Sequence, residues 1–313
     1  MSKGKIKNSM FSVLFEGVKI FFCNIDKFVV YMLFPVLGQL FGFILALALP
    51  LLLSGKIAEK ASSLSSAMLM VLLLAIPGLL IFIKAFWDYM VAYVALCSMT
   101  EGALTTGHVY DFQSHREVAT RRGGKYILFL LCVGLLSLIA LMFSIIPILG
   151  IIPPLIVWVY FILVFQIFAF EEDLSVKGYF TRSYDLIKGN WAKTFVLMVL
   201  LGFFSIFIIT EGVTVIFNYL HLTGKIAPLF DFVGNAMPLE YINKALSYAG
   251  MKVLTVNYIS ELIFTSCLGL IVAEFTLPIR SICWTLWYFS LSESKSEKKN
   301  ENPKKNKKSK EVE

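Results

Sequence analysis

The stretch that decides the fold runs from Phe168 to Phe195 and reads FAFEEDLSVKGYFTRSYDLIKGNWAKTF. An apolar run ends there at an acidic cluster, and a two-faced segment follows it. The apolar positions of that segment recur every three or four residues: Val176, Tyr179, Phe180, Tyr184 and Ile187. Gly189 is typical of a helix end and Asn190 of a helix start. The pattern predicts a membrane-spanning helix, a helix lying on the membrane surface, and a second membrane-spanning helix.

The composition extends this interpretation to the whole chain. The 313 residues are 58% hydrophobic and 16% charged, with a mean hydropathy of +0.77, whereas a soluble domain carries about 25% charged residues. The five cysteines lie in or beside apolar runs without CxxC spacing, so we expect them to be packing residues. The composition therefore excludes a water-soluble globular class.

Six apolar runs are long enough to cross the roughly 30 Å of hydrocarbon in a bilayer. The predicted fold is all-α, a single transmembrane domain over residues 1–292, followed by a disordered, Lys-rich cytoplasmic tail over 293–313. A partly helical outer loop is expected over 221–253. The predicted spans are residues 28–53, 67–99, 126–147, 151–170, 194–219 and 256–288.

Amphipathic helices are expected at the cytoplasmic surface between these spans. The first has an apolar face of Phe11, Leu14, Phe15, Val18 and Phe22, and the later one lies in the 168–195 stretch. Their basic side chains would face anionic lipid head groups. The candidate interfacial anchors are Arg182, Lys188, Asn190, Trp191 and Lys193.

Basic residues predict the orientation. The termini and the segments 100–125 and 171–193 share 21 Lys and Arg residues, and the opposite connections hold 5. Basic loops stay cytoplasmic, so both termini are expected in the cytoplasm of a bacterial cell, with the chain in its inner (plasma) membrane.

Two stretches resemble the membrane domain associated with glycerophosphoryl diester phosphodiesterases, a group of bacterial polytopic proteins of largely unassigned function. The first holds Glu171-Glu172, Arg182-Ser183, Leu186 and Lys188-Gly189-Asn190-Trp191; the second is Pro278 to Tyr288, PIRSICWTLWY. The resemblance covers roughly the second half of the chain and implies a polytopic architecture. No stretch has the soluble α/β character of the phosphodiesterase domain itself.

An internal repeat is also predicted. A shift of 166 residues aligns Asn24 with Asn190 and Lys27 with Lys193, and the middle of the chain offers a fainter copy, RGGKYILFLL against NWAKTFVLMV. A shift of 192 aligns Asp88 with Arg280. We expect three units, each composed of a surface helix, a span, an outer connection and a span.

The candidate site is an intramembrane polar cluster of four charged residues: Lys84, Asp88, Glu274 and Arg280. Lys84 and Asp88 are spaced i,i+4 and can neutralise each other, and the repeat suggests that Asp88 and Arg280 bridge two helices. Burying one such charge alone costs about 2.5–3.5 kcal/mol. The cluster either lines a site for an ion, lipid head group or peptide, or fixes helix packing. Asp88 lies about 31 Å from Ala67 at the start of the span, which is near the cytoplasmic edge of the membrane. A charge there can reach the membrane surface at little cost, which favours the packing role.

The sequence lacks common enzyme motifs. The sequence shows no Walker A, GxSxG or HExxH pattern, and His115 is expected to be a solvated loop histidine. We assign no catalytic residue, cofactor or metal ligand, and no nucleic-acid partner.

The expected function is a non-catalytic membrane protein that maintains the membrane or envelope through lipids, a protein partner or a homo-oligomer. The alternative is a secondary transporter that uses the charges between spans two and six, which contain Pro77 and Pro278.

Overall fold

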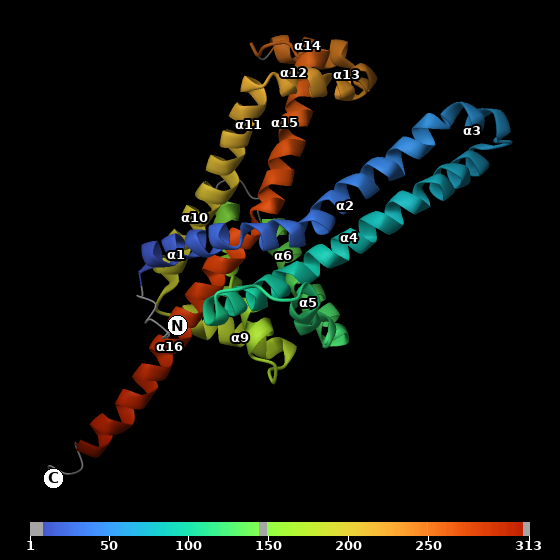
Figure 1. Ribbon diagram of the computed structural model, residues 1–313. Helices are drawn as coiled ribbons and strands as arrows, with labels where there is room; N and C mark the ends of the chain where they lie inside the picture. The colour runs from blue at the N-terminus through green and yellow to red at the C-terminus, as the bar shows by residue number, and fades with distance from the viewer. Residues whose placement is uncertain (1–8, 144–148, 249, 309–313) are drawn as a thin grey trace. The chain divides into compact units, whose positions relative to one another are not determined.

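The computed structural model describes residues 9–143, 149–248 and 250–308, and their regular structure is helical as predicted (Figure 1). Six helical segments in this described part are long and apolar enough to cross a membrane, which confirms a multi-pass architecture. They are Ile25–Pro50, Leu64–Thr106, Gly123–Phe143, Ile152–Phe170, Trp191–Tyr219 and Val256–Ser296. Each overlaps one predicted span. The second differs most, because it extends beyond the predicted 67–99 at both ends.

The chain divides into two compact units, one of residues 1–198 and 278–313 and the other of residues 199–277. The predicted single domain over 1–292 is thus made of two packing units, each described separately below. The element order follows the predicted repeat: a short helix, a long apolar segment, a connection and another long apolar segment occur three times in succession.

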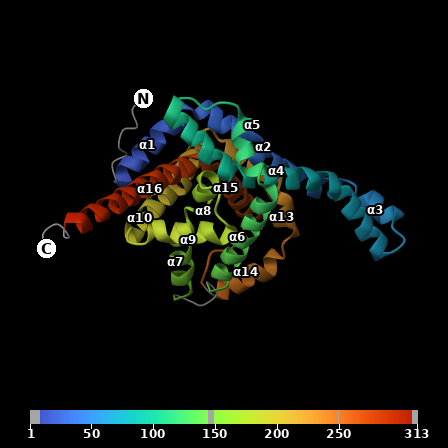
Figure 2. The same ribbon diagram turned by 90° about the horizontal axis from the view of Figure 1, so that it is seen from below.

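The first unit begins with α1 (Met10–Cys23) and a long helical hairpin. The hairpin consists of α2 (Ile25–Leu52) and α4 (Leu64–Thr106), with α3 (Ser54–Lys60) at its tip. Figures 1 and 2 both show α2 and α4 side by side along their length. Ser63 and Ser66 form a capping box that starts α4. The helix then runs unbroken through Pro77, so span two is not interrupted there.

Small residues let the two hairpin helices approach closely. A Cβ atom added to Gly78 of α4 would lie 2.2 Å from the Ala46 backbone nitrogen of α2, and one added to Gly42 would lie 2.5 Å from the Phe82 nitrogen. Gly38 faces the Ala85 side chain in the same way, at 2.8 Å. Small residues spaced four apart are the usual means of close helix packing in membranes.

The rest of the first unit packs around a buried aromatic cluster. Its helices are α5 (Phe112–Thr120), α6 (Gly123–Phe143), η1 (Leu149–Ile151), α7 (Ile152–Phe161), α8 (Val164–Phe170), α9 (Val176–Ile187), the start of α10 (Trp191–Gly202) and α16 (Leu277–Lys308). Tyr126, Phe129, Phe168 and Tyr179 are fully buried, and the Phe129 and Phe168 rings stack with centroids 5.0 Å apart. This cluster holds α9 against α6 and α8. Gly189, at φ +88°, ends α9 as predicted.

The second unit is a helical pair with a helical cap. It contains the end of α10, η2 (Phe203–Ile208), α11 (Ile209–Tyr219), α12 (Leu222–Ile226), η3 (Ala227–Phe230), α13 (Asp231–Ala236), α14 (Leu239–Tyr248) and α15 (Val256–Phe275). Ala227, Phe264 and Leu268 form its core, and the Ser260 hydroxyl donates to Asp231 Oδ1 at 2.6 Å. The predicted outer loop over 221–253 is thus largely helical where it is described.

The C-terminal helix differs from the prediction. α16 continues to Lys308, although the sequence predicts disorder from residue 293. The Lys and Glu residues that dominate this segment cannot form a core, but they have high intrinsic helix propensity. The apolar start of α16 already forms the first helical turns. The charged residues extend this helix without the free-energy cost of nucleation.

Candidate functional site

The structure places Asp88 at the centre of a small ion cluster in the first unit. Asp88 is 9% exposed, and its Oδ2 atom accepts a hydrogen bond from Lys84 Nζ one turn earlier in α4, which confirms the predicted i,i+4 pair. Its Oδ1 atom accepts a hydrogen bond from Arg116 Nη2 of α5 at 2.6 Å. Charge-assisted bonds to both oxygens stabilise a carboxylate that would otherwise be costly to bury.

Arg116 reaches Asp88 because α5 is docked on α4. Asp111 caps the start of α5 by accepting the Gln113 N–H at 3.2 Å. One turn into the helix, His115 Nδ1 lies 2.9 Å from Ser98 Oγ of α4, and His115 is only 7% exposed. The expectation of a solvated loop histidine is therefore wrong: the segment around residue 115 forms a helix that buries His115.

Burial also favours the neutral form of His115. Desolvation lowers its pKa below the ordinary value, and the nearby Asp111 carboxylate opposes this shift only in part. The neutral imidazole therefore suits this contact between α4 and α5.

The other two members of the predicted cluster have different positions. Arg280 lies near the start of α16 in the first unit, whereas Glu274 lies in α15 of the second unit. Arg116, and not Arg280, is the second cation bonded to Asp88. The contact between α4 and α16 lies nine residues further along α4, where Cys97 Sγ is 3.8 Å from Ser281 Oγ.

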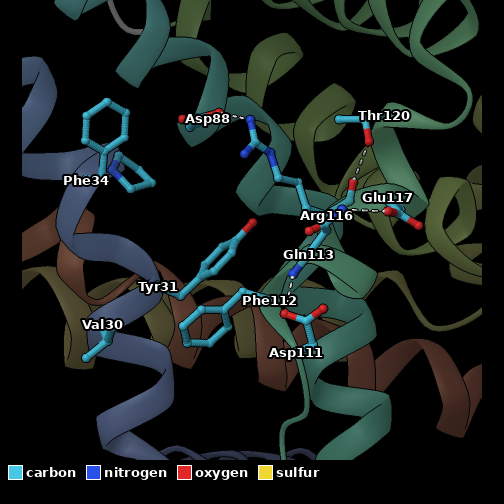
Figure 3. Close-up of a pocket in the computed structure, with 11 residues that line it drawn as sticks. Val30, Tyr31, Phe34, Asp88, Asp111, Phe112, Gln113, Arg116, Glu117 and Thr120 are labelled. Atoms are coloured by element: carbon cyan, nitrogen blue, oxygen red, sulfur yellow. Dashed lines mark hydrogen bonds and ion pairs between the residues drawn. The ribbon is translucent and has the colours of Figure 1, made fainter.

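A pocket of about 720 Å³ lies beside this ion cluster, between α2, α4 and α5 (Figure 3). One wall is apolar and mostly aromatic, and the other carries the polar side chains of α5. The lining residues are Val30, Tyr31, Phe34, Pro35, Asp88, Asp111, Phe112, Gln113, Arg116, Glu117 and Thr120. Its volume lies within the range of about 300–1,000 Å³ that small-molecule sites occupy.

Charge is unevenly distributed in this pocket. At its inner end, Asp88 is balanced by Arg116 and Lys84. Towards solvent, the exposed Asp111 and Glu117 add two carboxylates. Figure 3 shows the Arg116 side chain extending from α5 to Asp88, with Tyr31 between that ion pair and Phe112.

The predicted interfacial anchors lie on α9, at the start of α10 and in the turn between the two helices. The Arg182 Nε atom contacts both oxygens of Glu171 at 2.9 and 3.1 Å, and the Tyr288 hydroxyl donates to the same carboxylate at 2.9 Å. Arg182 thus fixes the packing of α9. The remaining anchors have varied surroundings: Lys188 is exposed with Nζ 5.9 Å from the Tyr184 ring, Asn190 accepts the Thr194 N–H through its carbonyl, Trp191 stacks on Phe195, and Lys193 is exposed.

Sequence reasoning missed a second ion cluster at the end of α8. The Arg121 Nη2 atom contacts both oxygens of Glu172 at 2.7 and 2.9 Å. Arg122 donates to the Phe168 carbonyl at 2.7 Å, and Lys125 donates to the Glu172 carbonyl at 3.0 Å. Arg122 therefore caps the end of α8, and Arg121 and Lys125 hold the turn that follows it. One signal could have paired them. The first apolar run of this hairpin begins with basic residues, and the second apolar run ends with acidic residues.

Among the described residues, no group of three or more His, Cys, Asp or Glu side chains is placed to hold a metal ion. The chain matches no protein-family model, no curated protein and no solved structure, so the role of the pocket and its ion cluster is inferred from their own residues.

Proposed function

We propose that this chain is a non-catalytic integral membrane protein that maintains the membrane or envelope by interacting with lipids or with a partner protein. The proposal includes a bacterial inner membrane, cytoplasmic termini and membership in the membrane-domain group that the sequence resembles.

The observation that carries this proposal is the pair of apolar faces on α1. One face packs on the protein through Val13 and Phe21, which are 0% and 6% exposed. A second face presents Phe11, Phe15 and Phe22 outward, with 57%, 73% and 60% exposed. An aromatic side chain of this size gains its hydrophobic stabilisation only when it leaves water. The acyl boundary of a bilayer provides that environment for a helix that lies on its surface.

The order of the membrane segments supports a position of all three surface helices on the same side of the membrane. α1 precedes the first membrane segment, α5 lies between the second and third, and α9 lies between the fourth and fifth. With six crossings, these three helices lie on one side, and the 21 basic residues of their segments and the tail favour the cytoplasm. Asp88 lies about 36 Å along α4 from Leu64, which is longer than the hydrocarbon thickness, so the ion cluster fits the same interface.

The test replaces the outward aromatic residues of α1 in the host cell. The variant Phe11→Ser/Phe15→Ser/Phe22→Ser should increase envelope permeability and alter phospholipid composition to the same extent as deletion of the gene. The matched control, Phe11→Leu/Phe15→Leu/Phe22→Leu, keeps the surface apolar and should behave as wild type. Unchanged envelope integrity and lipid composition after deletion would contradict the proposal.

The pocket beside Asp88 supports one second candidate, a secondary transporter. Substrate sites of transporters lie among charged residues within helical bundles. Flux of a small molecule or lipid in proteoliposomes, abolished by Asp88→Asn and by Arg116→Gln without loss of folding, would favour transport over the leading proposal.

A further inference from the structure

We propose that the pocket between α2, α4 and α5 binds a single phospholipid whose head group carries both a phosphate and an amine. This inference rests on the proposed function, because it specifies which lipid the protein recognises and where.

The two walls of the pocket suit the two ends of an amphipathic molecule. Tyr31 and Phe112 pack with ring centroids 5.4 Å apart at an interplanar angle of 58°, and Phe34 extends the aromatic wall along α2. The opposite wall is the polar face of α5, including Gln113 and Glu117. A ligand with polar groups alone would leave the first wall unused, and an alkane would leave the second unsatisfied.

An exposed apolar stripe on α2 continues from the pocket. Val30 and Phe34 line the pocket, and the stripe goes on with residues that share the same helical face. Its members, with their exposed fractions, are Val30 52%, Phe34 49%, Leu37 43%, Phe41 58% and Ile44 53%. The stripe is about 21 Å long, a length that suits an acyl chain extended along the helix towards the centre of the bilayer.

The charged groups of the pocket match the two charges of such a head group. A guanidinium has five N–H donors, and the bond from Arg116 to Asp88 uses one of them. The others suit a phosphate, which arginine binds in bidentate fashion. Asp111 and Glu117 supply carboxylates for an ammonium group, and the Tyr31 and Phe112 rings add faces that attract a cation.

The sum of these charges disfavours a head group that is only anionic. Asp88, Asp111 and Glu117 carry three negative charges, and Arg116 and Lys84 carry two positive charges. A net negative lipid would place its charge beside Asp111 and Glu117 without a cation to offset them. The amine of a zwitterionic lipid provides that cation.

Native mass spectrometry of the purified protein tests the proposal, with phosphatidylethanolamine and phosphatidylglycerol of identical acyl chains as probes. We expect one phosphatidylethanolamine adduct that forms about two- to fivefold more tightly than the phosphatidylglycerol adduct. The variant Asp111→Asn/Glu117→Gln should abolish this preference. Asparagine is as good a helix cap as aspartate, so α5 should remain folded.

The control is Glu101→Gln/Asp173→Asn, which makes the same change in charge at exposed positions outside the pocket and should retain the preference. Val30→Trp blocks the exposed wall and should remove the adduct even if the first variant fails to fold. Glycerophosphoethanolamine, which has the head group without acyl chains, should not displace the lipid at equal concentration.

The outcomes separate this inference from the proposed function. Equal binding of both lipids by the wild type, or a preference that survives Asp111→Asn/Glu117→Gln, overturns the head-group site and leaves the proposed function intact. Displacement by glycerophosphoethanolamine assigns the pocket to a soluble phosphoamine and overturns the lipid assignment. A failure of the proposed function would appear in the gene deletion and not in this measurement.

Discussion

Replacing Gly78 by alanine should separate the α2–α4 hairpin, because the new methyl group has no space. A Cβ atom at this position would lie 2.2 Å from the Ala46 nitrogen, 2.6 Å from Ala46 Cα and 2.6 Å from the Gly42 carbonyl oxygen. Ordinary van der Waals contacts of a Cβ begin near 3.4 Å, so the backbones must move apart by more than about 1 Å.

The expected cost follows from two opposing terms. Overpacking of this kind costs about 1–3 kcal/mol, and here the obstructing atoms belong to backbone, which cannot rotate away. Alanine regains about 0.8–1.0 kcal/mol of helix propensity over glycine. Because backbone atoms obstruct the methyl group, the upper half of the overpacking range applies, about 2–3 kcal/mol. After subtraction of the propensity term, we expect Gly78→Ala to lower the free energy of unfolding by about 1–2 kcal/mol.

Thermal unfolding in detergent measures this effect, with exposure of the buried Cys97 and Cys283 thiols as the signal. The matched control is Gly134→Ala in α6, where an added Cβ meets nothing within 4 Å and propensity alone should leave the protein equally or more stable. On the scale of domains of 150–250 residues, Tm should fall by about 2–4 °C for each kcal/mol lost by Gly78→Ala. A Gly78→Ala variant as stable as Gly134→Ala would refute the close packing of α2 against α4.

Four further variants test contacts within the first unit. Asp88→Asn removes a buried charge with two cationic partners and should lower stability by about 1–3 kcal/mol, whereas Lys84→Met, at a half-exposed partner, should cost under about 1 kcal/mol in the same unfolding assay. Because burial lowers the pKa of His115, the unfolded state takes up the proton first on acidification. Stability should therefore fall as the pH drops below about 6.5, and His115→Gln should flatten this part of the profile. Tyr288→Phe removes one bond to Glu171 and should cost about 1 kcal/mol; an unchanged Tm would contradict that contact.

The parts of the fold that could be predicted depend on local sequence. Six apolar runs gave six spans because length and hydropathy alone decide whether a helix can cross a bilayer. The Lys84–Asp88 pair and the helix end at Gly189 depend on neighbours within one turn, and both predictions are confirmed.

The parts that were missed depend on contacts between distant segments. Arg116 is 28 residues from Asp88, and Arg121 is 51 residues from Glu172, so neither pair has a periodic signal. The nine residues of α5 include few apolar side chains, so the helical pattern around His115 is weak. The close packing of α2 against α4 could have been predicted, because Gly38 and Gly42 form a GxxxG motif in an apolar helix.

The proposed topology puts α9 and the tip of the α2–α4 hairpin on opposite sides of the membrane. It is tested most directly by labelling single cysteines with a membrane-impermeant maleimide in intact cells, after serine has replaced the five native cysteines. Glu59→Cys in α3 should react from outside, and Lys188→Cys next to α9 should react only after the membrane is permeabilised. Labelling of Lys188→Cys in intact cells, or of both positions from the same side, would contradict the account.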